Sequence, residues 1–244
     1  MTTLEGFTSF DFEGPLAGGG EVRFRVYERG TGRRPIVLFQ ELPGIGPETL
    51  DLARRLDEAG YRVFLPHLFG PLGKTSFVGN TVRLLCMRRV FHLFATDAAS
   101  PIVAWMRALC RDVRARCESR GVGTIGMCLT GNFAITLMAD DAVVGGVASQ
   151  PSLPVFHPKA LHMSAEEIRA AREGMAAKGP ALAMRYEQDR ICPAAKMEAF
   201  AEAFGEHVIR ETFPGKGHSL LTLDWCEAAF TKVLEYFEQR FAAD

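Results

Sequence analysis

Short apolar runs alternate with amphipathic segments along most of this chain. Runs such as Pro35–Gln40 are almost continuously apolar, which is typical of strands buried on both faces of a sheet. Longer segments repeat apolar residues at helical spacing, and Pro47–Ala59 stops at Gly60, a common helix terminator. This alternation favours an α/β class: a mostly parallel central sheet with helices on both faces.

The predicted elements span most of the sequence. Val22–Tyr27 alternates between apolar and polar residues and lies between glycines, so we expect an antiparallel edge or hairpin strand there. The other predicted strands are Pro35–Gln40, Tyr61–Leu65, Val122–Met127, Val143–Ser149, Ala181–Glu187 and Val208–Phe213. The predicted helices are Pro47–Ala59, Pro101–Arg120, Leu129–Ala139, Ala165–Ala176, Pro193–Phe204 and Leu223–Ala242.

One segment, Pro66–Ser100, is too long for a simple connection between a strand and a helix. It contains several phenylalanines and basic residues. We interpret it as a partly helical excursion over the strand ends, serving as a cap or substrate wall within a single domain, residues 1–244. The alternative is an ordinary core helix with its loops.

Composition narrows the possible partners and location. The chain has 244 residues and a formal net charge of −1, which gives no argument for nucleic acid or acidic membrane surfaces. No apolar run is long enough to span a membrane, and the N-terminus lacks the features of a signal peptide. The 6 cysteines are dispersed, as expected of reduced thiols in a cytoplasmic protein. We expect a monomer or a small homo-oligomer.

The hexapeptide GMCLTG, Gly126–Gly131, carries the most informative pattern. It resembles a G-x-C-x-G nucleophile elbow, with cysteine where most such turns carry serine. A predicted strand precedes it and a predicted helix follows it, which is the context that this motif requires. Cys128 is therefore the candidate nucleophile, and the flanking glycines would remove collisions in a strained turn.

An acid and a histidine follow in the order that this topology requires. Asp189 comes just after the strand Ala181–Glu187, and His218 lies on a glycine-rich loop after Val208–Phe213. His218 would accept the proton of Cys128, and Asp189 would fix its tautomer. Glu187 is a local rival for the acid, and Asp189 could instead cap a helix.

Backbone donors must stabilise the oxyanion that forms during acyl transfer. The N–H of Leu129 is one candidate, and the N–H of Leu42, after the strand Pro35–Gln40, is a second. His67, after the next strand, could face the cleft. Gly121–Gly126 matches G-x-G-x-x-G but overlaps its strand, so it cannot form a dinucleotide-binding turn. Cysteine and histidine spacings fit no zinc pattern, so we predict no metal and no cofactor.

These motifs together resemble the dienelactone hydrolase family of α/β-hydrolases. The stretches that carry the resemblance are Gln40–Gly44, Gly126–Gly131, Asp189–Pro193 and Gly215–Ser219. The resemblance implies an α/β-hydrolase fold and a catalytic triad of Cys128, His218 and Asp189. It also implies that Glu41 lies beside the nucleophile and governs its ionisation.

The chain departs from the dienelactone-cleaving members in its anion-binding residues. Those members carry an arginine shortly after the histidine, where this chain has Leu220, Leu221 and Thr222. These members also carry a second arginine in the excursion after the third strand, and Arg83, or alternatively Arg88 or Arg89, is the candidate for that position. The expected activity is hydrolysis of a small-molecule carboxylic ester or lactone, larger or more neutral than dienelactone. The alternatives are a thioesterase or peptidase with the same triad, or a non-catalytic redox-sensing or binding protein.

Overall fold

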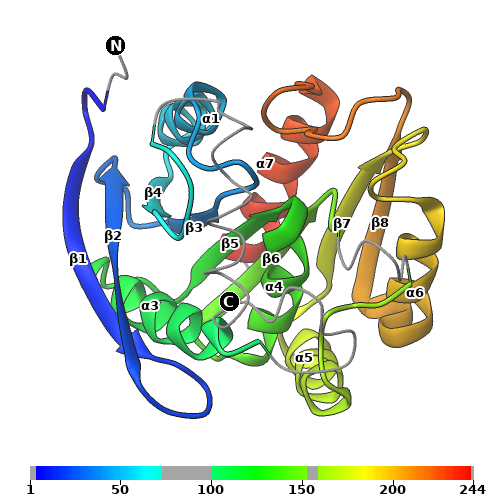
Figure 1. The fold of residues 1–244 in the computed structure, drawn as a ribbon, viewed down its shortest axis with the longest axis horizontal. Coiled ribbons are helices and arrows are strands. Elements are labelled where there is room, and N and C mark those ends of the chain that lie inside the picture. Colours follow the sequence, from blue (N-terminus) through cyan, green and yellow to red (C-terminus); the bar gives the residue numbers. More distant parts are fainter. Residues whose placement is uncertain (1–3, 73–99, 153–158, 243–244) are drawn as a thin grey trace.

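The computed structural model describes residues 4–72, 100–152 and 159–242 and contains an 8-stranded sheet in the order β1-β2-β4-β3-β5-β6-β7-β8 (Figure 1). The strands are β1 (Thr8–Pro15), β2 (Glu21–Arg29), β3 (Pro35–Phe39), β4 (Arg62–Pro66), β5 (Val122–Met127), β6 (Val143–Ser149), β7 (Ala181–Tyr186) and β8 (Val208–Phe213). The α-helices are α1 (Pro47–Glu58), α3 (Ile102–Arg116), α4 (Gly131–Thr136), α5 (Ala165–Lys178), α6 (Ala194–Phe204) and α7 (Glu227–Ala242). Short 3₁₀ turns are η1 (Cys128–Thr130), η2 (Leu137–Ala139) and η3 (Gly205–His207).

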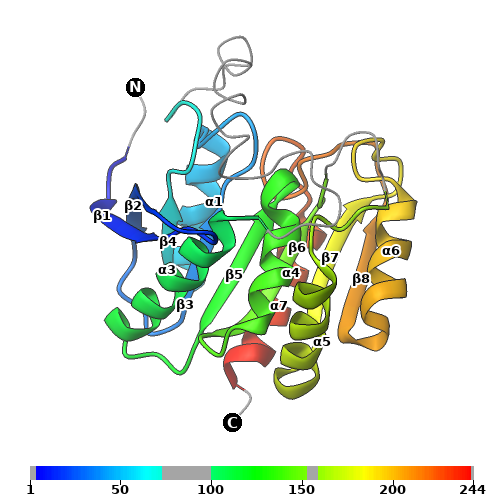
Figure 2. The same ribbon diagram turned by 60° about the horizontal axis from the view of Figure 1, so that its bottom comes forward.

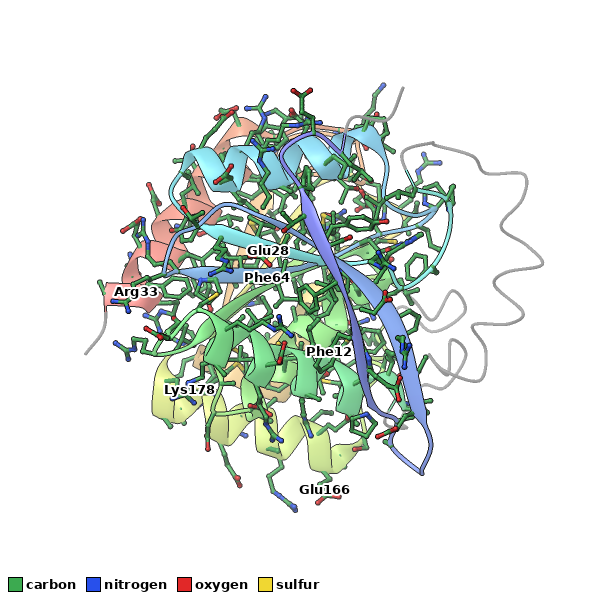
Figure 3. All side chains as sticks on the ribbon, turned by 90° about the vertical axis from the view of Figure 1, so that its left-hand side faces the viewer. Phe12, Glu28, Arg33, Phe64, Glu166 and Lys178 are labelled. Atoms are coloured by element: carbon green, nitrogen blue, oxygen red, sulfur yellow. The ribbon has the colours of Figure 1, made fainter. Side chains whose placement is uncertain are left out.

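All strands from β4 to β8 along the sheet pair in parallel, whereas β1 and β2 form an antiparallel hairpin at one side. The prediction of a hairpin strand at Val22–Tyr27 is confirmed, but β1 and not β2 occupies the edge. Most of β1 is exposed or half-buried, so its apolar signal in the sequence is weak. Phe12 of β1 packs edge-on against Trp105 of α3, with ring centroids 5.4 Å apart (Figure 3).

Helices cover both faces of the sheet, as the sequence pattern predicts. The strand β3 shows why, because its alternate side chains enter separate hydrophobic cores. Val37 and Phe39 belong to one core, together with residues of α3, α4, α5 and α6, while Ile36 and Leu38 belong to the other, together with residues of α1 and α7. Figure 2 shows these helices around the sheet. Within the described ranges, none of the helices is both long enough and apolar enough to cross a bilayer.

The parallel strands place their carboxyl ends along one edge of the sheet. The loops after β3, β5, β6, β7 and β8 therefore meet at this edge, where α/β proteins bind their ligands. These loops carry Glu41, Cys128, Ser152, Asp189 and His218. Most of the predicted excursion Pro66–Ser100 lies outside the described residues.

Candidate active site

Cys128 occupies a strained turn at the end of β5. Its φ of 53° is in the left-handed region, which is costly for a residue with a side chain and typical of functional turns. A Cβ on Gly126 would lie 2.2 Å from the carbonyl oxygen of Thr130, and one on Gly131 would lie 2.9 Å from Cα of Pro151. Both glycines are therefore required for the close packing of this turn.

The turn differs from G-x-C-x-G at one position. Thr130, not glycine, stands two residues after Cys128, and its hydroxyl ties the turn to the neighbouring strand. The Thr130 Oγ1 accepts the N–H of Met127 at 2.9 Å and lies 3.1 Å from the carbonyl oxygen of Gln40. This threonine fixes the elbow against the end of β3, a role that glycine could not fill.

His218 and Asp189 are paired as the sequence predicts. Nδ1 of His218 lies 2.7 Å from Oδ2 of Asp189, while Oδ1 of Asp189 accepts the N–H groups of Ile191 at 2.8 Å and Cys192 at 3.0 Å. Burial opposes ionisation of Asp189, but these hydrogen bonds outweigh it and hold its pKa below the usual value. Glu187, the local rival, is exposed.

The environment of His218 favours its protonated form. Burial lowers its pKa, but the hydrogen bond to Asp189, the polar contact with Cys128 and the negative charges of both side chains raise the pKa to about 10. Nε2 of His218 is buried and has no hydrogen-bond partner in the part of the chain that the structure describes. The ring thus holds a proton next to the nucleophile, in position to transfer it.

The sequence analysis missed a hydroxyl group that lies within hydrogen-bond distance of the nucleophile. Oγ of Ser152, in the loop after β6, lies 2.9 Å from Sγ of Cys128. Ser152 is only 1% exposed, and its N–H donates to the carbonyl oxygen of Cys128 at 3.1 Å. The signal available in the sequence was its place just beyond a strand predicted to end at the reactive edge of the sheet.

Glu41 is buried in a cage of polar side chains. Its carboxylate accepts hydrogen bonds from Gln150 at 3.0 Å, from Ser219 at 2.9 Å and from Thr222. Burial raises its pKa, while these hydrogen bonds and the charge of His218 oppose the rise. No hydrogen bond between described residues joins Glu41 to Cys128. Its described contacts reach the histidine loop, through Ser219, and the loop after β6, through Gln150.

Asp224 is a second residue that the sequence analysis missed. Its Oδ2 accepts the N–H of His218 at 2.7 Å and that of Ser219 at 3.1 Å. A Cβ on Gly217 would approach the Asp224 side chain to 2.6 Å, so glycine permits this contact. The prediction that a helix begins at Leu223 is wrong, because Asp224 belongs to this loop and α7 begins only at Glu227.

The other predicted residues have mixed placements. Leu129 follows Cys128 in η1, and Leu42 follows Glu41 in the loop after β3, so both lie on loops of the reactive edge. His67 Nε2 lies 2.9 Å from the carbonyl oxygen of Gly70, and its ring contacts Tyr27. Arg83, with Arg88 and Arg89, lies outside the described residues. Among the described residues, no group of His, Cys, Asp and Glu side chains is arranged to hold a metal ion.

Residues 26–239 match the sequence profile of the dienelactone hydrolase family. The chain belongs to this family. Membership makes the protein a hydrolase, and it confirms the resemblance drawn from the elbow, acid and histidine motifs. No curated protein matches the chain in sequence.

Solved structures show the same fold. A dienelactone hydrolase-like promiscuous phosphotriesterase from metagenomic libraries is 14% identical, with a TM-score of 0.69 over 98% of this chain and 100% of that chain. An esterase of Pyrococcus furiosus is 13% identical, with a TM-score of 0.64 over 97% and 92% of the two chains. A protein of Klebsiella pneumoniae that has been assigned as a dienelactone hydrolase is 16% identical, with a TM-score of 0.62 over 95% of this chain and 99% of that chain. At these identities the likeness establishes the α/β-hydrolase fold.

Proposed function

We propose that this protein hydrolyses a small-molecule carboxylic ester or lactone through an acyl-enzyme formed on Cys128. The observation that carries the proposal is the strained elbow at Cys128 beside His218, whose Nδ1 lies 2.7 Å from Oδ2 of Asp189. The raised pKa of His218, about 10, favours the imidazolium form of this ring. A cysteine beside an imidazolium and an orienting carboxylate is the arrangement that acyl transfer by a thiolate needs.

Acylation uses the proton on His218. The sulfur of Cys128 attacks the ester carbonyl carbon, and the N–H groups of Leu129 and Leu42 stabilise the oxyanion. The bond between carbon and the leaving oxygen then breaks, and Nε2 of His218 gives its proton to that oxygen. The products of this step are a thioester on Cys128, the free alcohol and a neutral imidazole.

Deacylation reverses these proton transfers. Acylation removes the negative charge from the sulfur, and this charge is one of the causes that raise the pKa of His218. The neutral imidazole can therefore accept a proton from water as the water attacks the thioester. The carbon–sulfur bond breaks, which releases the carboxylic acid and restores the thiolate and the imidazolium.

Glu41 would support this chemistry through the histidine loop. Its carboxylate holds the hydroxyl of Ser219, the residue directly after His218, and the charge of His218 favours the ionised form of this carboxylate. The family role of Glu41 is to govern ionisation of the nucleophile. The contacts observed here would serve that role indirectly, by setting the position of the imidazole through Ser219.

Ser152 would stabilise the sulfur in its charged form. We expect Ser152→Ala to lower kcat/KM about tenfold, because a hydrogen bond to a charged group contributes on the order of 1.5–3 kcal/mol, only part of which is lost if water replaces the hydroxyl. Ser152→Thr keeps the hydroxyl and should retain most of the activity. Steady-state ester kinetics and the rate of Cys128 alkylation by iodoacetamide at fixed pH measure both effects. Equal rates for the wild-type and Ser152→Ala proteins would show that the hydroxyl does not assist the sulfur.

The acyl-enzyme itself provides the direct test of the proposed function. Mixing the protein with an activated acetate ester should add one acetyl group to Cys128, and the added mass should disappear as the ester is consumed. Rapid-quench mass spectrometry of the intact protein and its peptides follows both steps. A thiol that reacts with peroxide but never carries an acyl group would favour the redox-sensing alternative.

A further inference from the structure

A pocket of about 560 Å³ lies beside Asp189 and His218. It is formed by the loops after β7 and β8, the same loops that supply the acid and the histidine. The residues that line it are Gln188, Asp189, Arg190, Ile191, Lys216, Gly217 and His218. The imidazole that transfers protons in the proposed mechanism is therefore part of the wall of this pocket.

The described residues of the wall give it a positive charge. Arg190 and Lys216 are exposed, and neither side chain forms an ion pair or hydrogen bond within the described part of the chain. Asp189 is the acidic member of the described wall, but its carboxylate is only 1% exposed and is engaged by His218 and backbone amides. Ile191, 60% exposed, adds an apolar surface next to these cations.

The chemistry of His218 indicates which part of a substrate would reach this pocket. The leaving oxygen must come within hydrogen-bond distance of Nε2 to receive its proton. Nε2 is buried and Nδ1 is bonded to Asp189, yet the side chain of His218 is 18% exposed, so its other atoms form the accessible edge. A leaving group that takes its proton from Nε2 would extend past this edge, along the wall of the pocket.

We propose that this pocket binds the leaving group of the substrate, and that this leaving group is an alcohol carrying a carboxylate or phosphate. The inference rests on the proposed ester hydrolysis and assigns the charge of one half of its substrate. The sequence analysis expected a more neutral substrate because no arginine follows His218. The pocket instead takes its positive charge from Arg190, on the loop of Asp189, and from Lys216, on the loop of His218. Arg190 and Lys216 are the residues that confer this specificity.

A matched pair of esters tests the proposal. The acetate ester of 3-hydroxyphenylacetic acid has an anionic leaving group, and the acetate ester of 3-hydroxyphenylacetamide is its neutral counterpart of nearly the same size. We expect the wild-type kcat/KM to favour the anionic ester roughly five- to tenfold at low salt, as two exposed ion pairs allow, and less at high salt. In the double variant Arg190→Gln/Lys216→Gln, this preference should disappear while turnover of the neutral ester stays within about twofold, since no contact of the triad is altered.

The control variant removes the same net charge elsewhere. Arg172→Gln/Arg210→Gln replaces two exposed arginines, on α5 and β8, that do not line the pocket, and it should keep the wild-type preference. Equal wild-type turnover of the two esters, or an equal loss of preference in the control, would overturn the proposal.

Binding of the free alcohols separates this inference from the proposed function. Calorimetric titration should show 3-hydroxyphenylacetate binding more tightly than its amide, with the difference lost in Arg190→Gln/Lys216→Gln. This result would support the pocket even if neither ester were hydrolysed. Equal binding of acid and amide would reject the pocket even if both esters were hydrolysed.

Discussion

Replacing Cys128 by alanine should lower kcat/KM for a neutral ester by on the order of 10⁴-fold, because the residual rate then comes only from binding and oxyanion stabilisation. The fold should survive, since cysteine and alanine both carry a Cβ at the φ of 53° that this position adopts. The contact with Ser152 is the main loss, so the melting temperature should change by only a few degrees. Ester kinetics and a thermal melt of the same preparation measure the two quantities.

Cys226→Ala is the matched control for this experiment. Cys226 is half-buried, as Cys128 is, and lies just before α7, outside the triad. Its removal should leave ester turnover unchanged, which would show that activity depends on one particular thiol. If Cys128→Ala kept full activity while remaining folded, the acyl-enzyme mechanism would be wrong.

The parts of the site that could be predicted from the sequence are those that local patterns determine. The elbow at Cys128 is recognisable because a strand, a nucleophile between glycines and a helix follow one another directly. Asp189 and His218 are recognisable because each follows a strand that the apolar pattern predicts, and the chain order of an α/β fold brings these strand ends together. The distance of 2.7 Å between them agrees with that reasoning.

The residues that the sequence did not reveal act through tertiary contacts. Ser152 contacts Cys128 because β6 pairs with β5 in the sheet. The local sequence of either strand does not determine this pairing. Asp224 lies in a segment whose sequence predicts a helix, but its side chain accepts the N–H of His218. Helix α7 therefore begins later, at Glu227. Strand β1 was missed for a different reason, since only Phe10 and Phe12 alternate with polar residues in a segment that is otherwise mostly exposed.

The hydrogen-bond partners of Glu41 are a detail that the family resemblance did not supply. The resemblance placed its carboxylate beside the nucleophile, whereas its described hydrogen bonds go to Gln150, Ser219 and Thr222. Thr222 stands in the segment where the dienelactone-cleaving members carry their arginine. In this chain that segment supplies the hydroxyl of Thr222 to Glu41. Motif spacing alone could not predict this hydrogen bond.

Asp189→Asn should lower kcat/KM by roughly 10³- to 10⁴-fold and shift the alkaline limb of the pH profile. His218 carries its proton below its pKa of about 10, so acylation should weaken as the pH rises through that value. The hydrogen bond to Asp189 is a main cause that raises this pKa, and its loss should move the limb about one to three units lower.

His218→Gln should abolish the limb together with most of the activity. Glu187→Gln, which removes the exposed acid two residues earlier, should leave both rate and profile unchanged. If the pH profile moved in Glu187→Gln and not in Asp189→Asn, Glu187 and not Asp189 would be the acid that orients His218.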